Sequence, residues 1–341
     1  MPDKREGSGD KMGFPAAPVG AVATGAGNRR ELLLTAVIAD PDNLDARLVY
    51  ADALVSANDP RGEFIQLDTA LDGPLSIRKR EALQLQRDAM FQAHAKTWWP
   101  YPVRLRVTKG FVEAISGVPS KLDAAAALFA SEPIAEVEVR GLRGVEGVER
   151  VLDAAWLPRV RRLSVRGKIE DAGFEALVTS PAVAQLEALN VTGNRIGPQG
   201  LAALQGRLPN LRSLVLSSNQ LDDAGLTGLL QYKHLRNLEM LYLGHCGLTA
   251  VGVDRLLDGP FPKLVKLALA GNKLGNAVGA TFAAKAHQLP ALRHLDLQKT
   301  GLGNVGAKHV AEARLPSIKK IDLRANRIDA TLAAGDPRIV T

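Results

Sequence analysis

The sequence predicts an α/β solenoid, a horseshoe with a parallel sheet on its concave side and helices on its convex side, preceded by a small all-α module. The first observation behind this prediction is a pattern of aliphatic residues that recurs every 25 to 28 residues from Ile134 onward, because a fixed period is the signature of stacked repeats. The second is composition. Hydrophobic residues make up 46% of the chain but aromatic residues only 4%, which favours a core of repeated aliphatic layers.

The repeat is defined by six complete copies of the pattern L-x-x-L-x-L-x-x-N-x-L, in which other aliphatic residues replace Leu and Cys or Thr replaces Asn. The alternating aliphatic residues predict a short strand, the Asn position predicts a bend, and the remaining residues predict a returning helix. No single unit buries its own apolar face, so we expect eight strands stacked into one sheet. The complete copies begin at Leu186, Leu211, Leu238, Leu264, Leu292 and Ile318, and degenerate copies begin at Ile134 and Val160.

The repeat length and the small residues at the helix starts, as in residues 198–204, resemble the ribonuclease-inhibitor-like class of leucine-rich repeats. This resemblance implies a leucine-rich-repeat solenoid of about eight repeats over residues 134–341. Residues 100–133 alternate at Val103, Leu105 and Val107, and we expect them to cap the N-terminal end of the solenoid.

Residues 29–99 are predicted to form a helical module, because apolar stripes are interrupted by prolines at positions 41, 60 and 74. Three of its segments, residues 39–42, 47–54 and 59–67, resemble the bacterial repeat-companion domain, which commonly precedes leucine-rich repeats. Ala53 stands where that family usually has a tryptophan. The resemblance implies an architecture and a bacterial source but no chemistry. Residues 1–28 are expected to form a disordered tail, since Gly, Ala, Pro and charged residues dominate them.

The charge of the chain limits the classes of partner. It has 43 Lys and Arg against 36 Asp and Glu, a net charge of +7, with both signs interspersed. This bias suits a partner with an acidic patch but lacks the long basic run typical of nucleic-acid binding, which we disfavour. The single cysteine excludes an internal disulfide and favours the cytoplasm. No run of about 18 apolar residues occurs, so we expect no membrane span.

The sequence contains no convincing set of catalytic residues. Cys246 follows His245, a pair that could be a nucleophile and its base. Because Cys246 occupies the Asn position of its repeat, we expect a buried and inert thiol instead. The six histidines show no metal-type spacing, and no glycine-rich phosphate loop with a lysine occurs. The sequence therefore predicts no metal, no cofactor and no enzymatic activity.

Binding is expected where residues are free to vary on a rigid frame, at strand positions that point away from the repeat core. Met240 and Tyr242, with Val215 and Ala268 beside them, form an apolar spot flanked by cations. An aromatic anchor with a polar rim is typical of a protein interface. The predicted partner-binding residues are Arg162, Arg166, Asn190, Val215, Met240, Tyr242, Lys266, His294, Asp296, Asp322 and Arg324.

The leading hypothesis is a non-enzymatic protein-binding scaffold, or adaptor, that grips a protein partner on its concave face. One alternative is that this face is idle and solvated. Another is regulation of an enzyme such as a small GTPase, because similar repeats occur in GTPase-activating proteins, although no residue can be named for that role. A third is nucleic-acid binding through the basic excess, which predicts a steep loss of affinity with salt. The sequence does not indicate an oligomeric state.

Overall fold

The computed structural model describes residues 26–329 and 336–341. Its helices are α1 (Ala26–Ala39), α2 (Leu44–Ser56), α3 (Pro60–Ala70), α4 (Ile77–Trp98), α5 (Pro119–Ala124), α6 (Leu128–Ser131), α7 (Gly144–Leu152), α8 (Glu170–Thr179), α9 (Pro198–Ala202), α10 (Asp222–Leu230), α11 (Ala250–Leu256), α12 (Ala277–Lys285) and α13 (Asn304–Glu312). Its strands are β1 (Arg104–Thr108), β2 (Phe111–Gly117), β3 (Glu136–Arg143), β4 (Arg162–Lys168), β5 (Ala188–Asn190), β6 (Ser213–Val215), β7 (Met240–Tyr242), β8 (Lys266–Ala268), β9 (His294–Asp296), β10 (Lys320–Asp322) and β11 (Ile339–Val340).

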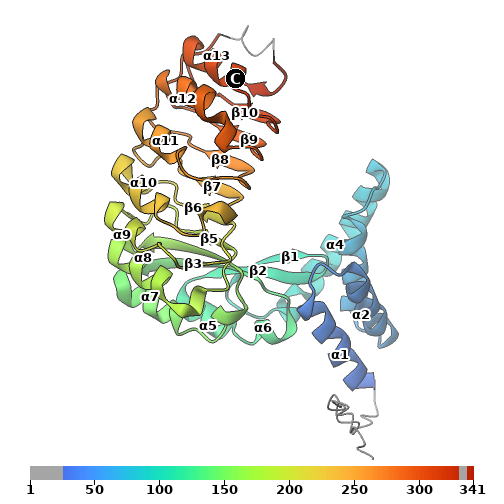
Figure 1. Ribbon diagram of the computed structural model, residues 1–341. Coiled ribbons are helices and arrows are strands. Elements are labelled where there is room, and N and C mark those ends of the chain that lie inside the picture. The colour runs from blue at the N-terminus through green and yellow to red at the C-terminus, as the bar shows by residue number, and fades with distance from the viewer. Residues whose placement is uncertain (1–25, 330–335) are drawn as a thin grey trace, which may run out of the picture.

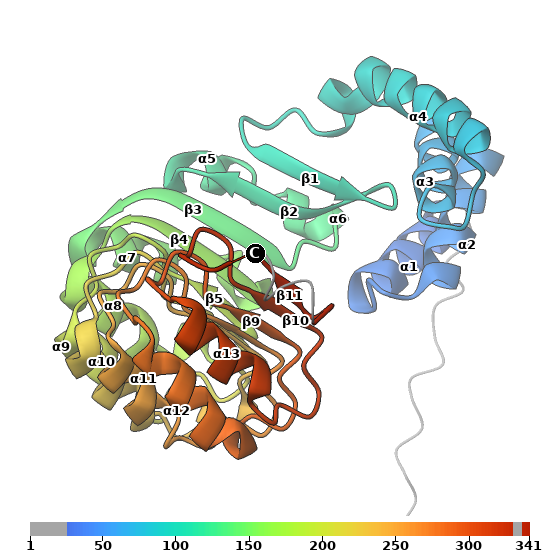
Figure 2. The same cartoon turned by 90° about the horizontal axis from the view of Figure 1, so that it is seen from above.

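The strands form one sheet of eleven strands, arranged in the order of the sequence. Figure 1 shows helices α7 to α13 stacked along one side of this sheet. Figure 2, seen from above, places the strands between these helices and helices α1 to α4. The predicted α/β solenoid is therefore confirmed. Most of the expected N-terminal tail, residues 1–28, lies outside the described residues, and α1 already begins at Ala26.

The pairing of the strands stacks the repeats in register. β1 and β2 form an antiparallel hairpin, and every later neighbour in the described sheet is parallel. The eight strands that the repeat pattern predicts are β3 to β10, while β11 was not anticipated. One line across the sheet is aliphatic throughout, each side chain being at most 1% exposed: Leu189, Leu214, Leu241, Leu267, Leu295 and Ile321. Burying one such leucine stabilises the fold by about 2 kcal/mol.

At three bends, an asparagine side chain joins one repeat to the repeat before it. The amide of Asn272 donates to the carbonyl oxygens of Leu243 and Leu269, both at 2.8 Å. Its oxygen accepts from the N–H groups of Cys246 at 2.9 Å and Leu248 at 3.1 Å. These bonds satisfy backbone groups that the bend would otherwise leave buried and unpaired. Two other repeats have equivalent bonds, made by Asn219 and Asn326.

Asn194 is the exception among these asparagines. Its amide donates to Val165 at 2.8 Å, but its buried oxygen accepts no hydrogen bond from the described residues. The preceding strand, β4, continues as far as Lys168, which pairs with β3 instead of forming the bend. The first bends of the solenoid are therefore less tightly linked than those near its centre.

We expect Asn272→Ala to lower the free energy of unfolding by about 3 kcal/mol, because two N–H groups and two carbonyls lose their partners. Asn194→Ala is the matched control and should cost about 1 kcal/mol, since its oxygen has no donor to lose. Urea denaturation followed by circular dichroism measures both values. Equal losses would show that the bends do not depend on these hydrogen bonds.

The N-terminal helices complete their core with a residue of the hairpin. Phe111, at the start of β2, is fully buried, and its ring centroid lies 5.9 Å from that of Tyr50 on α2. Helices α2 and α3 cross closely at Gly62, where a Cβ would lie 2.5 Å from the carbonyl oxygen of Ala51. The cluster around Phe111 consists of Val37, Tyr50, Ala51, Leu54 and Ile65. Helices and hairpin therefore share one core.

A buried carboxylate fixes the same joint. Glu132, which is fully buried, accepts hydrogen bonds from Arg61 at 2.5 Å, from the Trp99 indole at 2.9 Å and from the Val112 backbone at 2.9 Å. Arg61 comes from α3, Trp99 follows α4, and Val112 belongs to β2. One side chain thus connects the helices to the cap of the solenoid, with each of its oxygens hydrogen-bonded.

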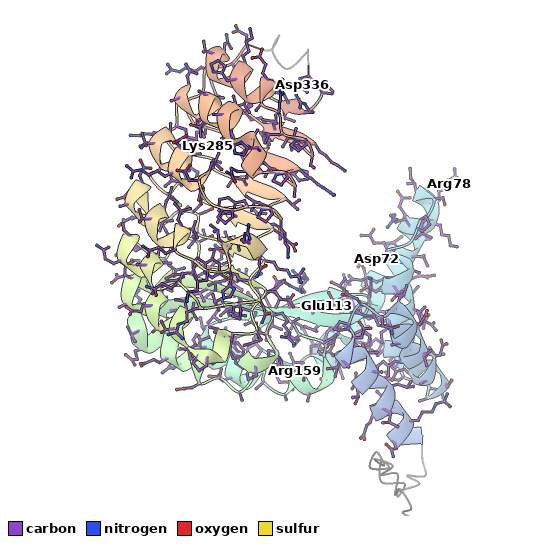
Figure 3. The ribbon with its side chains drawn as sticks, in the orientation of Figure 1. Asp72, Arg78, Glu113, Arg159, Lys285 and Asp336 are labelled. Atoms are coloured by element: carbon purple, nitrogen blue, oxygen red, sulfur yellow. The ribbon has the colours of Figure 1, made fainter. Side chains whose placement is uncertain are left out.

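Arg47 on α2 forms a second buried link. Its side chain is 1% exposed and pairs with Glu113 of β2 at 2.6 Å; Figure 3 labels Glu113 at this joint. Its other nitrogens donate to the carbonyl oxygens of Pro41 at 2.7 Å and Thr108 at 3.1 Å. Arg47, Arg61 and Gly62 lie in the segments that resemble the repeat-companion domain, and in this structure all three have packing roles.

We expect Glu132→Gln to destabilise the protein by about 3 kcal/mol or more, because the amide leaves Arg61 without its counter-charge and turns one acceptor into a donor. Glu149→Gln, on the exposed surface of α7, is the control and should change stability by less than about 0.5 kcal/mol. Thermal unfolding followed by calorimetry compares the two. A small effect of Glu132→Gln would mean that packing alone holds the joint.

Candidate functional site

The register of the strands arranges the predicted binding residues in two rows. The first row, in strand order, is Glu136, Arg162, Ala188, Ser213, Met240, Lys266, His294 and Lys320. The second row is Glu138, Ser164, Asn190, Val215, Tyr242, Ala268, Asp296 and Asp322. Both rows alternate with the buried aliphatic line and so lie on the concave face. Arg166 and Arg324 stand two residues further along the chain from the second row.

The centre of this face is apolar and partly exposed. Met240 is 37% exposed, and the Tyr242 hydroxyl oxygen lies 4.0 Å from its sulfur. The Lys266 ammonium lies 5.0 Å from the centroid of the Tyr242 ring, a favourable cation–π arrangement. Val215 is half-buried on the neighbouring strand, whereas Ala268 is buried. The apolar spot is therefore formed by Met240, Tyr242 and Val215, with Lys266 across it.

The arginines on either side of this centre are paired with acids. Arg162 lies 3.1 Å from Glu136, and Arg166 lies 3.2 Å from Glu138, both across the β3–β4 boundary. Burial alone would raise the pKa of Glu136, but hydrogen bonds and charge from Arg106 and Arg162 hold it below its usual value. The positive charge of these arginines is thus largely neutralised within the chain. Sequence reasoning missed these pairs, although Glu136 and Glu138 occupy the matching positions one repeat earlier.

The C-terminal end of the face has its own ion cluster. Asp322 is 5% exposed and pairs with Arg324 at 2.7 Å and Lys320 at 3.6 Å. Burial raises the pKa of Asp322, but the Arg324 hydrogen bonds and the charges of Arg324 and Lys320 lower it by more, so it lies below its usual value. Arg324 is consequently held by a neighbour.

Two polar residues of the second row also bond locally. The Asn190 side chain accepts from the N–H group of Thr192 at 3.0 Å, and Asp296 accepts from that of Gln298 at 3.0 Å. Such bonds stabilise the turn that follows each strand. His294, in the first row, is exposed. Of the predicted residues, Met240 and His294 are exposed and Tyr242 and Lys266 are half-buried, and none of these four has an ion-pair partner among the described residues.

A shallow hollow of about 200 Å³ lies on the same face between β3 and β6. The hydroxyl of Ser164, one of its lining residues, is buried without a hydrogen-bond partner among the described residues. Sequence reasoning named only some of its lining. Its lining includes Glu138, Arg162, Ser164, Asn190, Ser213 and Val215.

Cys246 does not form a catalytic pair with His245. The thiol is 1% exposed and bonds to the carbonyl oxygen of Leu216 at 3.3 Å, while His245 is exposed. Burial raises the pKa of Cys246 to about 11, although backbone hydrogen bonds with Asn219 and Ser218 lower it in part. Within residues 26–329 and 336–341, no group of three His, Cys, Asp or Glu side chains could hold a metal ion. None of the described helices is both long and apolar enough to span a membrane.

We expect Cys246 to react slowly with dithiobis(nitrobenzoate) in the native protein at about pH 8. The thiolate is the reactive form, and a pKa near 11 leaves about one thiol in a thousand ionised. After unfolding in guanidinium, the same protein should release one equivalent of thionitrobenzoate. Absorbance during the reaction provides the measurement. Rapid labelling of the folded chain would contradict the buried, protonated state.

Comparison with known proteins agrees with the repeat pattern. Residues 185–204, 207–230 and 288–311 match the family model described as Leucine Rich repeat. The chain is 30% identical over 203 residues to the ribonuclease inhibitor of Sus scrofa, covering 54% of this chain and 43% of that protein. It is 35% identical over 133 residues to podocan of Mus musculus, covering 39% of this chain and 20% of podocan.

The aligned regions represent less than half of each relative. A human protein, leucine-rich repeats and immunoglobulin-like domains protein 1, is 35% identical over 141 residues, 41% of this chain and 12% of that protein. Among solved structures, the complex of Rad7 and Elc1 in yeast aligns over 67% of this chain and 68% of the other, with 15% identity and a TM-score of 0.48. The recurring pattern, the single sheet of stacked strands and the matched segments together show a leucine-rich-repeat fold.

Proposed function

We propose that this protein is a non-enzymatic scaffold that binds a protein partner on the concave face of its solenoid. The observation that carries the proposal is the exposed Met240 beside the half-buried Tyr242, at the centre of a face whose other exposed side chains are mostly polar. Aromatic and methionine side chains within a polar rim have the composition of a binding hot spot. The proposed partner surface retains the predicted residues, with Met240, Tyr242 and Lys266 as its centre.

The rigidity of the frame supports the same function. The strands that present these side chains are fixed by the buried leucine line and the asparagine bonds. A preformed surface loses little conformational entropy on binding, so more of the contact energy appears as affinity. The relative in Sus scrofa is named as an inhibitor of ribonuclease, and a protein target of that kind is consistent with a concave binding face.

We assign residues 29–99 to a repeat-companion module, 100–133 to the cap and 134–341 to the repeats, in a cytoplasmic protein of bacterial origin.

The alternative functions have less support. The ion pairs of Arg162, Arg166 and Arg324 weaken the positive potential of the concave face, which argues against nucleic-acid binding there. No arrangement of the described residues specifically favours action on a small GTPase.

The test is affinity capture from host lysate with the intact chain and two double variants. Met240→Ala with Tyr242→Ala removes the apolar centre. Val251→Ala with Val305→Ala removes two side chains that are 58% and 62% exposed on the convex helices and serves as the control. We expect a stoichiometric protein partner to bind the intact chain and the control, and its affinity for the concave variant to fall at least about thirtyfold in calorimetric titration. Equal retention by both variants would place binding outside the concave centre.

A further inference from the structure

A second surface runs along the starts of the repeat strands. One hollow of about 450 Å³ lies between the α1–α2 connection, including Pro41 and Asp42, and the starts of β3 to β5. Another of about 400 Å³ continues past the starts of β5 to β7 as far as Lys263. The two hollows share Arg161 and Glu187 and so form one trough, which we call the strand-start trough. Figure 3 labels Glu113 and Arg159, which line its end at the helical module.

The far end of this trough leads onto a cluster of cations at the starts of β8 to β10. The cluster, called here the basic edge, consists of Lys263, Lys266, Arg293, Lys319 and Lys320. Among the described residues, only Lys320 of these five has an acid within 4.0 Å, and that acid, Asp322, is held more closely by Arg324. The positive charge of the basic edge is therefore largely uncompensated, in contrast to the paired arginines of β4.

This arrangement is unfavourable for the isolated chain. Neighbouring strands lie about 4.8 Å apart, so the cations on successive repeats repel one another. Arg293 and Lys319 occupy the same position in consecutive repeats, and both are exposed. An acidic ligand would remove this repulsion, and long basic side chains on adjacent strands offer it several contacts at once.

The walls of the trough suit a polypeptide. The side-chain amides of Gln185, Asn210 and Asn237 donate to carbonyl oxygens of the preceding repeat at 2.9, 3.1 and 3.4 Å. Their amide oxygens accept no hydrogen bond from the described residues and can accept the backbone N–H groups of a bound chain. The trough also contains Glu187, which lines both hollows and has no cation within 4.0 Å among the described residues, whereas Glu239 is paired with Arg212 at 3.1 Å. The Glu187 carboxylate would repel the uniformly spaced phosphates of a nucleic acid, whereas a peptide can place a neutral or basic side chain there.

We propose that the strand-start trough and the basic edge bind an extended segment of a protein partner whose acidic residues meet the basic edge; this rests on the proposed function, that the solenoid binds protein. The six strand spacings from β4 to β10 span about 29 Å, which an extended chain covers with about nine residues. The segment thus follows the edge of the sheet, beside the apolar centre of the concave face.

The direct test uses a fluorescein-labelled peptide of five glutamates followed by five serines, with fluorescence anisotropy at low salt as the readout. Arg293→Glu with Lys319→Glu reverses two charges of the basic edge. Lys273→Glu with Lys308→Glu reverses two exposed charges elsewhere, so both variants change the net charge by four. We expect the first variant to weaken peptide binding at least about tenfold and the second to change it by less than about threefold. Thermal unfolding verifies that both variants fold.

A single-stranded oligothymidine with ten phosphates is the comparison ligand and should bind more weakly than the peptide. Tighter binding of the oligonucleotide, equal losses in the two variants, or no peptide binding to the intact chain would each overturn the proposal.

The concave variant separates this proposal from the proposed function. Met240→Ala with Tyr242→Ala should keep peptide binding within about twofold, because it removes no charge from the basic edge, where Lys266 alone loses its contact with the Tyr242 ring. If lysate capture depends on Met240 and Tyr242 while the peptide fails to bind, the scaffold function stands and the acidic-segment proposal fails. If the peptide binds at the basic edge while lysate capture is unchanged by Met240→Ala with Tyr242→Ala, the proposed binding site on the concave face is contradicted and the acidic-segment proposal stands.

Discussion

The stacking of each repeat's aliphatic side chains on those of the next is the interaction on which the rest of the structure depends. A single repeat has one short strand and one short helix and cannot enclose its own apolar face. The register fixes Leu214 between Leu189 and Leu241, and this in turn fixes the rows on the opposite face of the strands. Because strand side chains alternate with a period of two, a shift of one residue would bury Tyr242 and expose Leu241.

The same packing extends into the N-terminal helices. Phe64 and Trp99 belong to the cluster that continues through the repeats to Ile339, and Phe111 closes the core of α1 to α3. Glu132 and Arg47 add buried hydrogen bonds across the joint. The helices therefore hold a defined position beside the starts of β3 to β5, which makes the strand-start trough a fixed feature of the fold.

The sequence predicted the features that depend on periodicity, and missed those that depend on distant contacts. The recurring Leu and Asn positions were sufficient to predict the solenoid, its eight strands and the strand positions that point outward. Arg162 is paired because Glu136 lies next to it on the neighbouring strand. A list of outward positions does not show which of these side chains form ion pairs. The buried role of Glu132 has no local signal, since its partners Arg61 and Trp99 are 71 and 33 residues away. The end of the trough beside Pro41 and Asp42 arises only when the helical module is placed against the sheet.

The central claim is that helices and repeats are held together by Phe64 and Trp99, which pack in the solenoid core, and by the buried bonds of Glu132 and Arg47, so that both binding surfaces are preformed. Native-state hydrogen exchange of the intact chain across low urea concentrations tests it most directly. The account predicts that the most protected amides of α2 and α3 and those of β6 to β8 open with the same free energy and the same urea dependence. Markedly easier opening of α2 and α3, with a smaller urea dependence, would show a separate unit tethered to the solenoid and would contradict the claim.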